Sequence, residues 1–302
     1  MLFPGNSDYR GRHAGAYVPR PSPMRHVVRI AVVLLMLGLL AWPFVEPLFP
    51  EVEEVTLQPA DFPEDISQLR VVYVSDIHAG PFFSQARVED LVRRINRLNA
   101  DIVLLGGDYA QDSASAVEFF RSLPAIHANY GVYAVTGNHD RTVPESNLAL
   151  LREAMLQAGV TPLINEVASV RIGNASIWLA GVDDLSCGHP DVAGVASQVR
   201  KEDYVIFLCH SPAVIPDAVE ARDANFQYGW FDLGLFGHTH GGQVDLFGGI
   251  VRDDSVPEAY REGWSRTSRA DLLTSRGYGV SVLPIRLLCR PQIHLITLRS
   301  SN

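Results

Sequence analysis

The chain has 302 residues, of which 47% are hydrophobic and 20% are charged, and this composition excludes a disordered or low-complexity protein. Residues 1–29 carry a net charge of +4, so the rest of the chain carries −13. An acidic folded part argues against a nucleic-acid partner, because binding to phosphates requires a basic face. The three cysteines are too few and too scattered for a disulfide framework or a CxxC metal site.

The first predicted element is a membrane anchor. Residues 30–45 form a run of 16 residues without a charge. At about 1.5 Å per residue this run makes a helix of roughly 24 Å, and flanking apolar residues can extend it toward a ~30 Å hydrocarbon core. A cleaved signal peptide and a buried core helix are the alternatives. Because no small-x-small cleavage site follows the run and it has no polar face, the sequence favours one uncleaved transmembrane helix.

The flanks of the run predict its orientation. Five arginines precede it and four glutamates follow it within residues 46–54, which places the N-terminus in the cytoplasm and the folded part outside the cell membrane. The segment after the run is rich in proline and acids, as linkers often are. The predicted organisation is a basic tail at 1–29, the anchor at 30–49, a linker at 50–66 and one folded domain at 67–302.

Apolar strand patterns alternate with helical patterns along the folded part. Strands are expected at 71–74, 101–105 and 131–135, with one helix after Ser84 and another from Pro144 to about Ala158. Later strands are expected at 163–166, 169–172, 176–180, 204–209, 233–236 and 293–298. This alternation predicts an α/β layered sandwich.

Five short polar clusters each follow one of these apolar patterns. They are Asp76-Ile77-His78, Gly107-Asp108, Gly137-Asn138-His139-Asp140, His210, and Gly237-His238-Thr239-His240-Gly241-Gly242. Ligand sites in α/β sheets form beyond the carboxyl ends of the strands, so these side chains are expected to meet. Each cluster has an ordinary explanation as a turn or a core-edge histidine; their joint occurrence carries the argument.

In this order the clusters closely resemble the signature of the calcineurin-like metallophosphoesterase superfamily. The anchor and the tail at 275–293 are similar to its membrane-associated bacterial YaeI/YkuE-like branch, although Gln292 stands where an acid is usual. The resemblance implies a four-layer α/β/β/α sandwich that holds two divalent metal ions, for which imidazole and oxygen ligands suit Mn, Fe or Zn. It assigns one metal to Asp76, His78 and His240, the other to Asn138, His210 and His238, and makes Asp108 the bridge.

The resemblance also implies a mechanism, in which a hydroxide bridging the metals attacks phosphorus while His139 protonates the leaving oxygen. In the protein phosphatase branch an aspartate orients that histidine, but here Gln111 occupies its position and the following Arg-Gly is missing. Asp112 and Asp140 are the alternatives for the orienting role, and a phosphoprotein substrate is not expected. Arg141 and Arg286 are candidates to contact the substrate phosphate, with a solvated or ion-paired surface role as the alternative.

The leading hypothesis is a membrane-anchored phosphodiesterase or pyrophosphatase that acts on a lipid or a lipid-linked nucleotide such as UDP-diacylglucosamine. A nuclease or cyclic-nucleotide phosphodiesterase on the same fold is the first alternative, although the acidic domain and the single lysine (Lys201) disfavour a nuclease. A non-catalytic binding protein that kept the fold is the second. The sequence does not predict an oligomeric state.

Overall fold

The computed structural model describes residues 23–142, 146–244 and 253–300. The chain divides into two compact units, Met1–Ala41 and Trp42–Asn302. The first described element is helix α1 (Pro23–Val45), which begins seven residues before the expected anchor. A stretch of 25 residues, Met24–Leu48, is long and apolar enough to cross a membrane, and none of its apolar window is buried in the protein. This exposure rules out a buried core helix.

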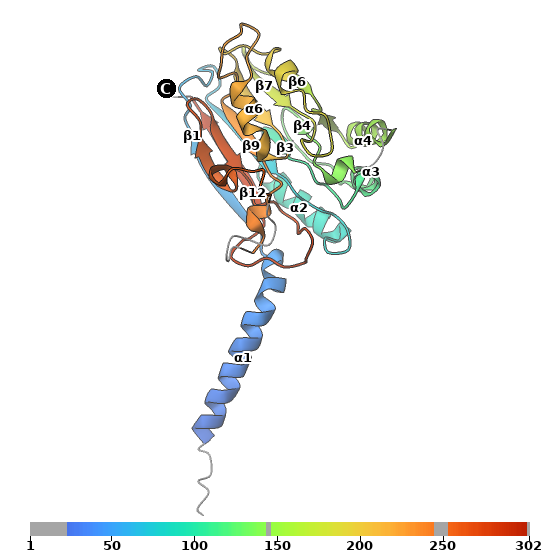
Figure 1. Ribbon diagram of the computed structural model, residues 1–302, viewed down its shortest axis with the longest axis vertical. Coiled ribbons are helices and arrows are strands. Elements are labelled where there is room, and N and C mark those ends of the chain that lie inside the picture. Colours follow the sequence, from blue (N-terminus) through green and yellow to red (C-terminus); the bar gives the residue numbers. More distant parts are fainter. Residues whose placement is uncertain (1–22, 143–145, 245–252, 301–302) are drawn as a thin grey trace, which may run out of the picture. The chain divides into compact units, whose positions relative to one another are not determined.

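The first sheet contains six strands and follows from the apolar patterns of the early part of the domain. Its order is β1-β12-β2-β3-β4-β5, and β2 through β5 run parallel. Helices α2 (Gln85–Arg97), α3 (Ser113–Ser122) and α4 (Ser146–Gln157) cover one face of it (Figure 1). The strands are β1 (Glu51–Leu57), β12 (Gln292–Arg299), β2 (Gln68–Val74), β3 (Ile102–Leu105), β4 (Val132–Ala134) and β5 (Val160–Pro162).

The second sheet also contains six strands, in the order β10-β11-β9-β8-β7-β6. The short helices α5 (Val192–Ala196) and α6 (Ile215–Glu220) pack against its outer face. The four central strands β11, β9, β8 and β7 are parallel. The strands are β10 (Gly263–Arg266), β11 (Asp271–Thr274), β9 (Leu233–Phe236), β8 (Tyr204–Leu208), β7 (Ala175–Gly181) and β6 (Glu166–Ile172).

The alternation of side chains along β2 shows how the two sheets stack. Val72 and Val74 face the helices of the first sheet, whereas Val71 and Tyr73 point into a second apolar core shared with strands of the other sheet. That second core lies between the sheets and includes Leu179, Ile206 and Leu235. The order of layers is therefore helix, sheet, sheet, helix, which confirms the predicted α/β/β/α sandwich.

Residues 51–57 correct the interpretation of 50–66 as a linker. They form β1, which pairs in parallel with β12 from Glu51 opposite Gln292 to Leu57 opposite Leu298. The sequence did not indicate this strand, because its acidic residues are typical of a solvent-exposed segment. Glu51 and Glu53 instead accept hydrogen bonds from the side-chain amide of Gln292.

One smaller expectation also changes. The strand expected at 163–166 falls largely in the turn between β5 and β6. The helix expected to begin at Pro144 is described from Ser146, and Pro144 lies outside the described residues. Helix α3 was not expected; it begins after Asp112, whose carboxylate accepts the backbone N–H of Ser115.

Candidate metal centre

The five polar clusters lie directly beyond the carboxyl ends of five parallel strands. Three clusters follow β2, β3 and β4 of the first sheet, and the other two follow β8 and β9 of the second. Two stacked parallel sheets can bring such loops together only if their carboxyl ends lie at the same edge, and here they do. Segments that are up to 164 positions apart in sequence consequently share one site, as Asp76 and His240 do.

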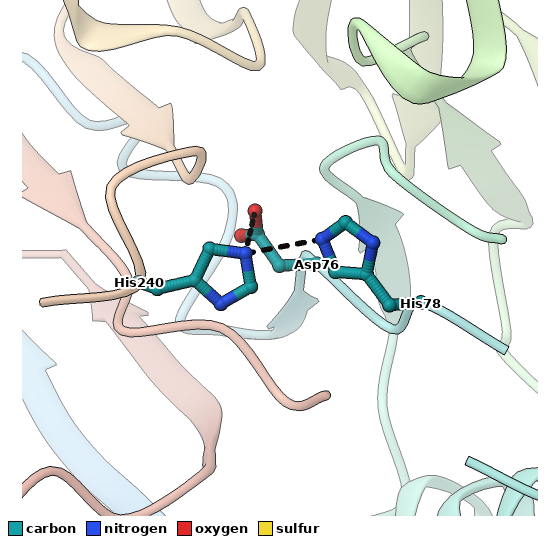
Figure 2. Close-up of side chains that lie close together, drawn as sticks. All are labelled: Asp76, His78 and His240. Atoms are coloured by element: carbon teal, nitrogen blue, oxygen red, sulfur yellow. Dashed lines mark hydrogen bonds and ion pairs between the residues drawn. The ribbon is translucent and has the colours of Figure 1, made fainter. Parts of the chain in front are cut away.

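Six of the predicted ligands, together with His139, form three overlapping groups, in each of which the possible ligand atoms lie within 4.8 Å of one another. Figure 2 shows the first group, in which His240 Nε2 lies 3.0 Å from His78 Nε2 and 3.5 Å from Asp76 Oδ1. Asn138 joins through its Oδ1, which is 2.9 Å from His238 Nδ1. The groups are Asp76, His78 and His240; His78, Asp108 and His139; and Asp108, His210 and His238.

A left-handed backbone conformation is frequent among the predicted ligands. Five of them adopt left-handed φ values between 48° and 70°. This conformation is costly for residues with a Cβ atom, and it persists where the surrounding structure forces it, commonly at functional sites. The five residues are Asp76, His78, Asp108, His238 and His240.

The glycines of two motifs allow the loops to approach. A Cβ atom on Gly107, which has a φ of 92°, would lie 2.6 Å from the backbone nitrogen of Gly137. A Cβ atom on Gly137 would lie 2.2 Å from Asp108 Oδ1. Side chains at either position would therefore push the loop after β3 away from the loop after β4, and Asp108 would leave the centre of the site.

The protonation states of the buried groups suit cation binding. Burial lowers the pKa of His78 and of His240, so both imidazoles stay neutral, which is the form that ligates metals. Burial alone would raise the pKa of Asp108, but His210 and His78 lower it, so the carboxylate stays ionised. The pKa of His210 is raised by Asp108 against the effect of burial, which makes these two a charged pair in the cation-free protein.

The hydrogen bonding of the ligands also fits metal ions. His210 Nδ1 lies 2.8 Å from the carbonyl oxygen of Gly106, to which it donates, so its Nε2 points into the site. That buried Nε2 makes no hydrogen bond of normal geometry, although Asp108 Oδ2 is 3.2 Å away. His238 Nε2 lies 3.1 Å from Asp253 Oδ2, and a carboxylate behind a histidine is the usual support of a metal ligand. Imidazole, carboxylate and amide donors together suit Mn, Fe or Zn.

His139 is oriented by the main chain. Its Nδ1 lies 2.9 Å from the backbone carbonyl oxygen of Gln111, the residue that replaces the expected aspartate. Asp112 is occupied with capping α3. The carboxylate of Asp140 accepts three backbone N–H groups, those of Asp108, Tyr109 and Gly137. Neither alternative aspartate therefore orients His139.

The structure corrects the two arginines that were expected to contact substrate. Arg286 is fully buried, and its guanidinium donates to the backbone carbonyl oxygens of Gly279, Cys289 and Arg276. Arg141 is buried in a two-pronged ion pair with Asp183, with both N–O distances at 3.0 Å. The alternative for both was a solvated or ion-paired surface role; Arg141 does form an ion pair, but in a buried position, and Arg286 instead donates to buried backbone carbonyl oxygens.

A cavity of about 390 Å³ opens over the metal-binding residues. Part of its lining was not expected from the sequence, because single serines and an Asp-Asp pair in a loop carry no pattern that distinguishes them from other surface residues. None of the described lining residues is Lys or Arg. The additional lining residues are Ser186, Thr239, Asp253, Asp254 and Ser281.

The family model described as Calcineurin-like phosphoesterase matches residues 69–242, more than half of the chain. The chain is a calcineurin-like phosphoesterase. Membership in this metal-dependent family, with the clustered ligands, makes it a metal-dependent phosphoester hydrolase.

Three relatives are similar over most of the chain. The uncharacterized metallophosphoesterase YkuE of Bacillus subtilis is 28% identical over 86% of this chain and 89% of its own length. Phosphodiesterase YaeI of Escherichia coli is 28% identical over 79% of this chain and 85% of its own. A bovine transmembrane protein with a metallophosphoesterase domain is 31% identical over 72% of this chain and 49% of its own length. The resemblance to the membrane-associated branch is thereby confirmed, and these relatives suggest membrane association for this chain.

Proposed function

We propose that the chain is a membrane-anchored phosphodiesterase with two metal ions, which cleaves a P–O bond in a lipid or a lipid-linked nucleotide such as UDP-diacylglucosamine. The observation that carries this proposal is that six of the seven predicted ligands, all but Asn138, belong to three overlapping groups of possible metal-binding side chains, two of which contain the carboxylate of Asp108. A carboxylate in that position is able to bridge two cations.

The grouping supports a division of the ligands between two cations. Asp76, His78 and His240 would hold one, and Asn138, His210 and His238 would hold the other, with Asp108 shared. Bound divalent cations would supply an activated water and neutralise the charge of the phosphate. The positively charged side chains that many phosphatases use for the second task are absent from the described lining of the cavity.

His139 is the candidate general acid. Its Nδ1 is held by the carbonyl oxygen of Gln111, and its backbone N–H donates to Asp108 Oδ1 over 2.9 Å. These two contacts fix the ring beside the cavity and leave Nε2 as the atom that can give a proton to the leaving oxygen.

The end of α1 supports an uncleaved anchor. Glu46, directly after the helix, is buried and accepts hydrogen bonds from Trp42 Nε1 and from the backbone N–H groups of Leu288 and Cys289. Cleavage after the apolar run would remove one of these partners from the folded part. The arginine-rich N-terminal segment supports a cytoplasmic N-terminus, with the catalytic domain outside the cytoplasm.

The first test is diesterase activity and metal content of the full-length protein in detergent with Mn²⁺. Wild type should hydrolyse bis(p-nitrophenyl) phosphate and contain about two cations per chain, and Asp108→Ala should lower the rate at least about 100-fold and the cation content to below about one. Asp112→Ala is the matched control, since this aspartate only caps α3. Full activity of Asp108→Ala would contradict the proposal.

The second test concerns the substrate. A lipid-linked nucleotide or phospholipid in mixed micelles should be cleaved faster than single-stranded DNA or a cyclic nucleotide. The carboxylates of Asp253 and Asp254 in the cavity lining disfavour a polyanion. Faster cleavage of DNA or of a cyclic nucleotide would contradict the proposed lipid substrate but not the proposed metal site.

A further inference from the structure

Exposed apolar side chains gather around residues 43–49, at the start of the second compact unit. The loop at 281–288 is fastened there, because the backbone N–H of Leu288 donates to Glu46 and that of Arg286 donates to the carbonyl oxygen of Pro43. On the other side, Arg87 donates to the carbonyl oxygens of Pro47 and Phe82. These contacts bring together six exposed apolar residues, which we call the apolar rim: Leu48, Phe49, Phe82, Val282, Leu283 and Leu288.

The tip of the loop is strained and yet exposed. Val282 has a φ of 60° and Leu288 a φ of 57°, a conformation that costs a β-branched or bulky residue about 1–2 kcal/mol. Val282 is 80% exposed and Leu288 is 62% exposed, so packing against the described residues does not offset this cost. A strained apolar side chain that the protein leaves exposed indicates that this turn contacts a partner other than water.

The turn is also held rigidly. Gln243 is fully buried, and its side-chain amide donates to the carbonyl oxygens of Ser281 and Leu283. Its Oε1 accepts the backbone N–H of Ser281. Ser281 itself lines the cavity over the metal-binding residues. The residues that follow it in the rim are therefore presented directly beside the opening of the candidate active site.

We propose that the apolar rim seats in the lipid headgroup and acyl boundary of the bilayer. The rim is continuous with the candidate membrane span, since Leu48 is the last residue of that span and belongs to the same compact unit as the rest of the rim. Trp42 stacks on Phe49 with ring centroids 6.2 Å apart, and tryptophan is enriched at membrane interfaces. Seating would hold the cavity at headgroup level, where the phosphate of a lipid lies.

This inference rests on the proposed function and specifies it: the substrate phosphate reaches the cavity from the bilayer surface through the side formed by Ser281. The proposal needs no conformational change. It also explains why the loop carries apolar residues in strained positions, where asparagine, aspartate or glycine would fit at lower cost.

The test compares two tryptophan substitutions in the full-length protein, reconstituted into phosphatidylcholine and phosphatidylglycerol nanodiscs. Val282→Trp places the probe in the rim. Phe226→Trp is a matched control, because Phe226 is 79% exposed with a φ of 61° and precedes β9, whereas the site follows that strand. Brominated lipids should quench the added fluorescence of Val282→Trp at least about twofold and leave that of Phe226→Trp nearly unchanged. Equal quenching of the two would overturn the proposal.

A second measurement keeps the rim and the proposed function distinguishable. Val282→Asp with Leu288→Asp should lower the ratio of the rate on a vesicle-bound lipid diester to the rate on bis(p-nitrophenyl) phosphate by roughly tenfold. Aspartate tolerates left-handed φ, so folding should be preserved, and Phe226→Asp should leave the ratio unchanged. An unchanged ratio in the double variant would contradict seating, whereas a wild type inactive on all diesters would contradict the proposed function alone.

Discussion

His139 Nδ1 lies 2.9 Å from the backbone carbonyl oxygen of Gln111. A carbonyl oxygen only accepts hydrogen bonds, so Nδ1 carries one proton, and Nε2 is the ring nitrogen that can hold a second proton and give it to the leaving oxygen. The orientation of this histidine is therefore set by the path of the loop after β3. The identity of the side chain at position 111 does not set it.

Gln111→Ala should consequently keep diesterase activity within about threefold of wild type, because the variant retains the carbonyl oxygen, whereas His139→Gln should lose at least about 100-fold. The Gln111 side chain makes only a 3.3 Å hydrogen bond to the His78 carbonyl oxygen. Steady-state kinetics on bis(p-nitrophenyl) phosphate measures both. A loss in Gln111→Ala as large as that in His139→Gln would show that the side chain orients the ring.

Asp140→Asn should destabilise the protein by about 1–3 kcal/mol, because one of the three backbone N–H groups that the carboxylate accepts would face an amide NH₂. Two of those N–H groups belong to Asp108 and Gly137, so metal content should also fall. Denaturant unfolding and elemental analysis measure the two effects. The control is Asp112→Asn, which affects the single cap of α3 and should cost less than about 1 kcal/mol. Equal stability of Asp140→Asn and wild type would refute this role.

Arg286→Lys should lower the melting temperature, because an ammonium cannot reproduce the guanidinium contacts with three separate backbone carbonyl oxygens in a fully buried position. A cost of about 3 kcal/mol or more is expected for breaking such a buried network. Arg290→Lys, at the exposed neighbouring cation, should change stability by less than about 0.5 kcal/mol. A raised KM with an unchanged melting temperature in Arg286→Lys would instead indicate substrate binding.

Glu53 should make stability depend on pH in the acid range. The hydrogen bond from His294, whose Nδ1 lies 3.3 Å from Glu53 Oε2, lowers the pKa of this carboxyl from its ordinary value of 4.5. A lowered pKa contributes stability above the ordinary value, and that stability is lost as the pH falls through the lowered one. The contribution should stay below about 1 kcal/mol, because the side chain is 38% exposed and solvent screens the pair.

Glu53→Gln should therefore reduce the difference in unfolding free energy between about pH 6 and pH 3. The control is Glu54→Gln, which changes the next residue of β1 on its exposed face and should leave that difference unaltered. Denaturant melts followed by tryptophan fluorescence at each pH give both numbers. If the unfolding free energy depends on pH identically in wild type and Glu53→Gln, this carboxyl does not contribute to the acid dependence of stability.

The sequence by itself determined the strand-and-loop pattern and the residues that the structure brings together. Apolar runs predict buried strands, and the polar residues that follow them, such as Asp76 and Asp108, lie at the carboxyl ends of those strands. These signals are local, since hydrophobic periodicity and turn chemistry act over a few residues. The apolar run near the N-terminus gives a local signal of the same kind, and it is helical in the structure.

Tertiary structure decided what depends on partners far away in the chain. Glu51 and Glu53 belong to a strand because β12 lies beside them, and the side chain of Gln292, 241 and 239 positions later, donates to both carboxylates. Arg286 is buried because backbone carbonyl oxygens converge on it, and a sequence does not display where carbonyl groups point. The orientation of His139 depends on such a carbonyl as well. The sequence gives the identity of each side chain. The hydrogen-bond or ion-pair partner of each buried charge or ring nitrogen is determined only when the two sheets pack.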